Sequence, residues 1–171
     1  MGDTDTARLV FVPVSVAAAQ RVLAGETLCD VPAFRASAEL AESFGIAESG
    51  AEAVEFAALT VAALAALTQY GERRVLVAEP PAELPNSVWE SEALNGGIQL
   101  ETLPAAYVTA FFCDADTAAT AALIRTAAAV AQGLSVDDAW ELPEVSALID
   151  ETDLLWHDIT ELSAYLAERI S

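Results

Sequence analysis

Lysine is absent from this sequence of 171 residues, and its seven basic residues are all arginines. Without a lysine the chain cannot form a Schiff base with a carbonyl substrate or with pyridoxal phosphate, and it cannot contain a phosphate-binding loop of the G-x-x-x-x-G-K-S/T type. The dinucleotide motif G-x-G-x-x-G and the nucleophile elbow G-x-S-x-G are missing as well. The sequence therefore has no motif for several common classes of enzyme, and we expect no cofactor.

Positive charge is also scarce, because 27 acidic residues outnumber the seven arginines and give a formal net charge of −20. Nucleic acids and anionic lipid surfaces bind clustered basic residues, so a chain of this charge is repelled by both. We therefore expect neither nucleic acid nor a membrane as a partner. Solubility is the plain explanation of the acidity, and recruitment of a basic partner is the alternative.

Cysteine occurs twice, at Cys29 and Cys113, without the C-x-x-C spacing of redox or metal sites. A disulfide could join the two, but we expect two buried, reduced thiols in a cytoplasmic protein. The first residues, "MGDTDTARLV", lack the basic and apolar regions of a secretory signal. The run "FAALTVAALAALTQY" is too short and too rich in alanine to predict a membrane span.

Apolar residues are plentiful, at 54% of the chain, which is enough for a sizeable core in a chain of one-domain length. We predict a flexible tail over residues 1–7 and a single α/β domain over residues 8–171. Apolar runs predict strands at residues 8–14, 31–37, 73–79, 98–102 and 106–114. Helical periodicity predicts helices at residues 16–24, 38–44, 51–70, 87–94, 117–131 and 152–170.

The predicted strands are continuous apolar runs and do not alternate strictly between apolar and polar residues. Such runs are typical of a sheet that is buried on both faces. The sequence therefore predicts a mixed or mainly parallel sheet of four to five strands, covered by helices. Ser15 and Ser37 are expected to cap the first two helices, Gly71 to end the helix over residues 51–70, and residues 134–146 to form a connection.

The helix over residues 51–70 is the strongest prediction. Its expected inward stripe consists of Phe56, Leu59, Ala63 and Leu67. Glu55 precedes this stripe and is predicted to be a structural residue that forms an ion pair with an arginine. The candidate partners are Arg35, Arg73 and Arg74.

Several short stretches resemble an uncharacterised family of small actinobacterial proteins. They are "RLVFVP", "AFRAS", "EFAALTVAALAAL", "RRVLVAE" and "LLWHDITEL". The resemblance implies a bacterial cytoplasmic protein and carries no activity. The terminal motif of the family is similar to "ELLWY", so that His157 stands where a tyrosine is common. This departure argues against a shared catalytic role for His157.

The stretch "AFFCDADTAA" ends an apolar strand with Asp114 and Asp116. It is similar to the first motif of haloacid-dehalogenase-type phosphatases, in which an aspartate attacks phosphate beside Mg²⁺. That motif has Thr or Val four residues after the first aspartate, whereas this chain has Ala118. We therefore interpret one of the two aspartates as the N-cap of the next helix.

The stretch "DETDLLWHDITEL" contains the only histidine. In a helix over residues 153–169, Asp153, His157 and Glu161 would lie on one outer face, at a spacing that can present zinc or manganese ligands. One histidine and two exposed carboxylates are a weak set, so a solvated helix face is the expected role. Trp156 would lie at the edge of the apolar face, and we predict that it is important for core or dimer packing.

These observations favour a small non-enzymatic protein that acts through a protein partner or as a homo-oligomer. The absence of a catalytic constellation and the three tryptophans of an acidic chain motivate this hypothesis. The alternative is a metal-dependent hydrolase that uses Asp114 and Asp116 or the stripe of Asp153, His157 and Glu161. Mimicry of nucleic acid by surface carboxylates is a third hypothesis.

Overall fold

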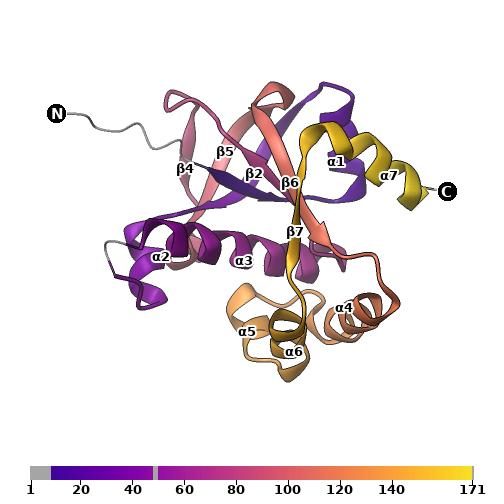
Figure 1. Cartoon of the computed structure of the whole chain (residues 1–171). Coiled ribbons are helices and arrows are strands. Elements are labelled where there is room, and N and C mark those ends of the chain that lie inside the picture. The colour runs from indigo at the N-terminus through magenta and orange to yellow at the C-terminus, as the bar shows by residue number, and fades with distance from the viewer. Residues whose placement is uncertain (1–8, 48–49, 171) are drawn as a thin grey trace.

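A computed structural model describes residues 9–47 and 50–170, so the predicted tail over residues 1–7 lies outside the described residues. One sheet of seven strands forms the centre of the protein, and all neighbouring strands are antiparallel (Figure 1). In spatial order the strands are β4 (Asn86–Val88), β5 (Gly97–Pro104), β2 (Thr27–Arg35), β1 (Val10–Pro13), β3 (Val75–Ala78), β6 (Val108–Asp114) and β7 (Leu154–Asp158).

The prediction of a mixed or mainly parallel sheet with four to five strands is therefore wrong in strand direction and in strand number. Burial on both faces produces continuous apolar runs in an antiparallel sheet as well, so the runs did not identify the direction of the strands. The two strands that the prediction missed are the edge strands β4 and β7, which are short and largely exposed.

Helices cover both faces of the sheet. The helices are α1 (Val16–Leu23), α2 (Ala38–Ser43), α3 (Ala51–Tyr70), α4 (Ala118–Ala131), α5 (Val136–Trp140), α6 (Pro143–Glu151) and α7 (Leu162–Ile170). Short 3₁₀ helices are η1 (Glu90–Asn95), η2 (Ala105–Tyr107) and η3 (Ile159–Glu161). The α3 helix and the α4–α6 group lie on one face, and α1 and α7 lie on the other (Figure 1).

Local capping signals are confirmed at the first helices. The side chain of Ser15 accepts a hydrogen bond from the Ala18 amide, and that of Ser37 accepts one from the Leu40 amide, each at 3.1 Å. Gly71 ends α3 in the left-handed conformation with φ of 75°.

The α3 helix lies in the core and matches its predicted bounds. By length and composition alone it could cross a membrane, but 67% of its most apolar window is buried inside the protein. Leu59, Ala63 and Leu67 are buried as predicted, whereas Phe56 is 69% exposed. Because α3 is buried nearly all round from Ala57 to Thr68, a single inward stripe does not describe it, and Phe56 precedes this buried part.

Three predicted elements in the second half of the chain are wrong. The helix expected over residues 87–94 is the end of the strand β4, followed by the 3₁₀ helix η1. Residues 134–146 contain α5 and the start of α6, where a connection was expected. The helix expected over residues 152–170 is the strand β7, followed by η3 and α7. β7 forms because its residues pair with β6, in a register that sets Phe112 opposite Trp156, and this long-range pairing overrides local helical periodicity.

The N-cap of α4 is Thr117, so the prediction that Asp114 or Asp116 caps this helix is wrong. The Thr117 hydroxyl accepts a hydrogen bond from the Thr120 amide at 3.1 Å, while Asp116 is exposed and Asp114 has another partner, described below. Threonine and aspartate are both good N-cap residues, so composition alone does not choose between neighbouring candidates.

We expect Thr117→Ala to lower the free energy of unfolding by about 1 kcal/mol, because the amide at the start of α4 loses its acceptor. Asp116→Ala, one residue away and exposed, should change it by less than about 0.5 kcal/mol. Urea unfolding of both variants measures the difference, and equal effects would contradict this assignment of the cap.

Candidate functional site

A buried ion pair joins the chain before β3 to the end of β6, on the face of the sheet that α3 and α6 cover. Arg73 lies two residues before β3 and Asp114 ends β6, and the β3–β6 register, continued beyond the pair of Val75 and Phe112, brings the two residues opposite each other. The Arg73 Nε donates to Asp114 Oδ2 at 3.0 Å, and the Arg73 Nη2 donates to Asp114 Oδ1. The side chains are 6% and 7% exposed, so the pair is almost completely shielded from water.

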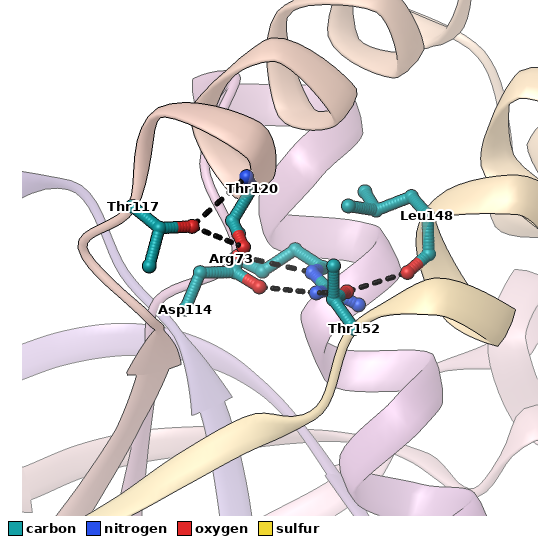
Figure 2. A network of polar contacts seen from close by, with 6 residues as sticks. All are labelled: Arg73, Asp114, Thr117, Thr120, Leu148 and Thr152. Atoms are coloured by element: carbon teal, nitrogen blue, oxygen red, sulfur yellow. Dashed lines mark hydrogen bonds and ion pairs between the residues drawn. The ribbon is translucent and has the colours of Figure 1, made fainter.

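The same guanidinium also reaches the segment that leads into β7. Arg73 Nη2 donates to the Thr152 hydroxyl at 2.6 Å, and this hydroxyl donates to the Leu148 carbonyl in α6 (Figure 2). Both carboxylate oxygens of Asp114 face Arg73 in the same view. Asp114 therefore connects strands, and its use as a nucleophile or metal ligand would leave a buried arginine without its counter-ion.

The other predicted carboxylates do not gather around Asp114. Asp116 and Asp153 are exposed. Asp153 directly precedes the strand β7, and four residues of strand separate positions by about 13 Å, so Asp153 and His157 are not neighbours on a helical turn. Among the residues that the structure describes, no three His, Cys, Asp or Glu side chains are grouped as metal ligands.

His157 is 30% exposed and stacks on Phe111, with ring centroids 5.0 Å apart. Its Nδ1 lies 3.6 Å from Glu161 Oε1, so one contact of the predicted stripe exists. The other carboxylate oxygen of Glu161 accepts a hydrogen bond from the Asp158 amide at 2.9 Å, within a capping box at the start of η3. Helix capping thus accounts for Glu161.

Glu55 is half-buried on α3. Two of its three predicted partners bind other carboxylates, since Arg73 pairs with Asp114 and Arg74 pairs with Glu72. Within residues 9–47 and 50–170, no ion pair of Glu55 is formed.

A second polar cluster lies on the opposite face of the sheet, and the sequence did not indicate it. Arg74 is 1% exposed, and its Nε donates to the Tyr165 hydroxyl at 3.1 Å. The guanidinium of Arg169 lies 4.0 Å from the centroid of the Tyr165 ring, in a cation–π contact. Burial raises the pKa of the Tyr165 hydroxyl, so this group is neutral at pH 7 and accepts the hydrogen bond from Arg74.

Cys113 lies near this cluster and is buried, as predicted, whereas Cys29 is exposed. Both thiols are free. Burial raises the pKa of Cys113 to about 11, so that its thiol is protonated and a poor nucleophile at neutral pH. The burial of Cys113 follows from its position on β6, whose side chains alternate between the two covered faces.

An apolar pocket of about 360 Å³ opens between α3, α6 and the start of β7. Its lining includes Phe56, Leu64, Phe112, Val145, Ile149 and Leu154. Arg73 and Thr152 also line the pocket, so the polar network of Figure 2 forms part of its wall. The volume is at the lower end of the range for ligand pockets.

Next to the pocket, the edge strand β7 exposes two large apolar side chains. Leu155 is 42% exposed and Trp156 is 59% exposed. Trp156 lies opposite Phe112 of the pocket wall, and cross-strand partners share a face of the sheet. We define the β7 surface as Leu155, Trp156 and this pocket. Trp156, predicted to pack in the core or a dimer, is thus largely open to solvent in the single chain.

The fold and this surface define a small acidic α/β protein with an apolar surface at one edge of its antiparallel sheet. The family described as "Family of unknown function (DUF6912)" matches residues 8–166, and the chain belongs to this family. No curated protein and no solved structure matches the chain.

We expect Asp114→Asn to lower the free energy of unfolding by about 3 kcal/mol, because it leaves the buried Arg73 without a counter-ion. The matched control is Glu26→Gln, which breaks the exposed pair between Arg21 and Glu26 and should cost less than about 1 kcal/mol. Chemical unfolding at neutral pH measures both. Similar losses in the two variants would show that burial of the Arg73 pair does not matter.

The raised pKa of Cys113 predicts a loss of stability at alkaline pH. Between the ordinary value of 9.0 and about 11, the thiol ionises in the unfolded chain and stays protonated in the folded protein. The free energy of unfolding should therefore fall as the pH rises through this window. Cys113→Ala should flatten this pH dependence, and Cys29→Ala should leave it unchanged. Unfolding curves recorded from pH 8 to pH 10.5 decide between these outcomes.

Proposed function

We propose that the protein acts by binding another protein chain through the β7 surface, and that it does not catalyse a reaction. The observation that carries this proposal is the exposure of Leu155 and Trp156 on an edge strand beside an apolar pocket. Another chain can pair with an exposed apolar edge strand as an additional strand of the sheet. Natural proteins usually protect such an edge, or use it to bind a partner. Tryptophan is among the residues most enriched at the energetic centre of interfaces.

The opposite edge of the sheet gives the contrast. There β4 has only three residues, of which Asn86 and Ser87 are polar and Val88 is 60% exposed. The pocket that includes Asn86 measures about 40 Å³, whereas the pocket beside β7 measures about 360 Å³. The apolar character and the pocket distinguish β7, which supports binding at this edge.

The metal-dependent hydrolase has less support. Asp114 binds Arg73 through both of its oxygens, Asp116 lies in solvent, and the strand geometry separates Asp153 from His157. A hydrolase of this kind would need these groups to converge on one ion. Asp114 would have to leave the buried Arg73 to do so.

We also propose that the protein works in the cytoplasm of an actinobacterium. Its free thiols suit a reducing compartment. Abundant alanine beside a complete lack of lysine suits a GC-rich genome.

We expect Trp156→Ser to abolish association, whether with a second copy or with another protein, and to leave the fold intact because the side chain is exposed. Val88→Ser is the matched control, since Val88 has nearly the same exposure on the other edge strand. Sedimentation velocity over a range of concentrations measures self-association, and affinity capture with the three proteins as bait measures partners. A strictly monomeric chain with no partner lost specifically by Trp156→Ser would contradict the proposal.

A further inference from the structure

The outer edge of β7 carries backbone groups that can pair with another strand. In the described part of the chain β7 is the last strand of the sheet, and it pairs with β6 alone. Each edge strand directs a row of N–H and C=O groups away from its sheet, and an extended segment can bind to such a row as an added strand. β7 has five residues, enough for a short ladder of this kind.

Acidic side chains surround this edge. Asp153 and Asp158 lie at the two ends of β7, and Asp150 and Glu151 end the preceding helix α6, all of them exposed. Hydrogen bonds from the backbone and then the hydroxyl of Thr160 lower the pKa of Asp158, which keeps this carboxylate ionised. Between Arg125 and Arg169 the sequence has ten acidic residues and no arginine, with His157 as its one titratable basic group.

The negative charge around β7 decides which chain can bind to its edge, a second copy of this protein or a segment of another protein. A second copy would bring the same carboxylates and a net charge of −20 toward an identical set. Like charges brought together at an interface oppose association, whereas opposite charges speed it and select the partner. A segment rich in lysine or arginine is therefore the complementary occupant.

The side chains of β7 indicate which residue types the bound segment needs in addition to basic ones. Leu155 and Trp156 are neighbours on a strand, so they point to opposite faces of the sheet and an added strand would contact one on each face. The apolar pocket begins at Leu154 and can receive an apolar side chain from the same segment. The recognised segment thus combines apolar residues with basic ones.

Resting on the proposed function, we propose that β7 binds an extended, basic segment of a partner protein as an eighth strand of the sheet. Apolar side chains of the segment contact Leu155, Trp156 and the pocket, and its lysines or arginines pair with Asp153 and Asp158. Main-chain hydrogen bonds give the segment its extended form, and the carboxylates exclude further copies of this chain.

The test uses synthetic peptides of the repeat Lys-Val-Val-Lys as the probe, because an extended peptide of this repeat carries valines and lysines on both of its faces. Two matched peptides serve as controls: one replaces every lysine by glutamate, and the other keeps the lysines and has alternate backbone nitrogens methylated, which prevents strand pairing at equal charge. Hydrogen exchange of the full chain, followed by NMR, reports protection at those amides of residues 154–157 that do not pair with β6, because the Asp158 amide already donates to Glu161. We expect the unmodified lysine peptide to slow exchange there and both controls to leave it unchanged.

Variants of the chain then test the side chains. Trp156→Ser should weaken binding of the lysine peptide at least about tenfold, as expected for the central residue of an interface. Asp153→Asn combined with Asp158→Asn should weaken it and reduce its dependence on salt, and asparagine preserves the cap that Asp158 provides. Val88→Ser should bind like the unchanged chain.

Three results would overturn the inference. Equal binding of the methylated peptide would mean attraction by charge without an added strand. Protection of the same amides by rising concentrations of the chain alone would identify a second copy as the occupant, which leaves the proposed function standing. A partner that is lost by Trp156→Ser but does not protect these amides would likewise retain the proposed function and reject strand addition.

Discussion

The position of the whole C-terminal segment depends on two consecutive buried arginines. Arg73 and Arg74 immediately precede β3, and their side chains reach opposite faces of the sheet. Arg73 binds Asp114 and Thr152 on the face of α3 and α6, while Arg74 binds Tyr165 on the face of α7. Thr152 precedes β7 and Tyr165 follows it, so one dipeptide contacts the chain on both sides of this strand.

This arrangement explains why buried charge is tolerated here. An arginine without a counter-ion would be costly in the interior, but Arg73 has a carboxylate with two acceptors and a hydroxyl. Such a network requires a particular geometry from each member, since an unmatched donor or acceptor would cost more than an apolar residue at the same place. The pair therefore favours one register of β6 on β3 and one path for the chain into β7.

The sequence was a good guide where structure is decided locally. The serine caps of α1 and α2, the bounds of α3, and the strands β1, β3 and β6 all follow from side chains within a few residues. β7 could not be predicted in this way, because its strand form depends on β6, about forty residues earlier in the chain. Asp114 was recognised as notable, but its partner Arg73 is 41 residues away, and spacing cannot reveal such a pair.

In the candidate site, too, features set by neighbouring residues could be predicted from the sequence, and features set by long-range contacts could not. An "RR" dipeptide before an apolar strand could have signalled buried charge, since an arginine buried at a strand end needs a carboxylate nearby. Trp156 was predicted to be important for core or dimer packing, and its exposure depends on β7 being an edge strand, a property of sheet order. Its role in binding stays a prediction.

Acidity and the open edge of β7 are best understood together. Charged residues beside an edge strand are a common protection against pairing between identical chains, and Asp153 and Asp158 fit that role. Protection by carboxylates is selective, however, because it repels acidic chains and attracts basic ones. A chain with only seven arginines, of which Arg73 and Arg74 are buried, and no lysine cannot readily offer a matching segment of its own, whereas another protein can. The composition that keeps copies of this protein apart is therefore the same property that would select a basic partner.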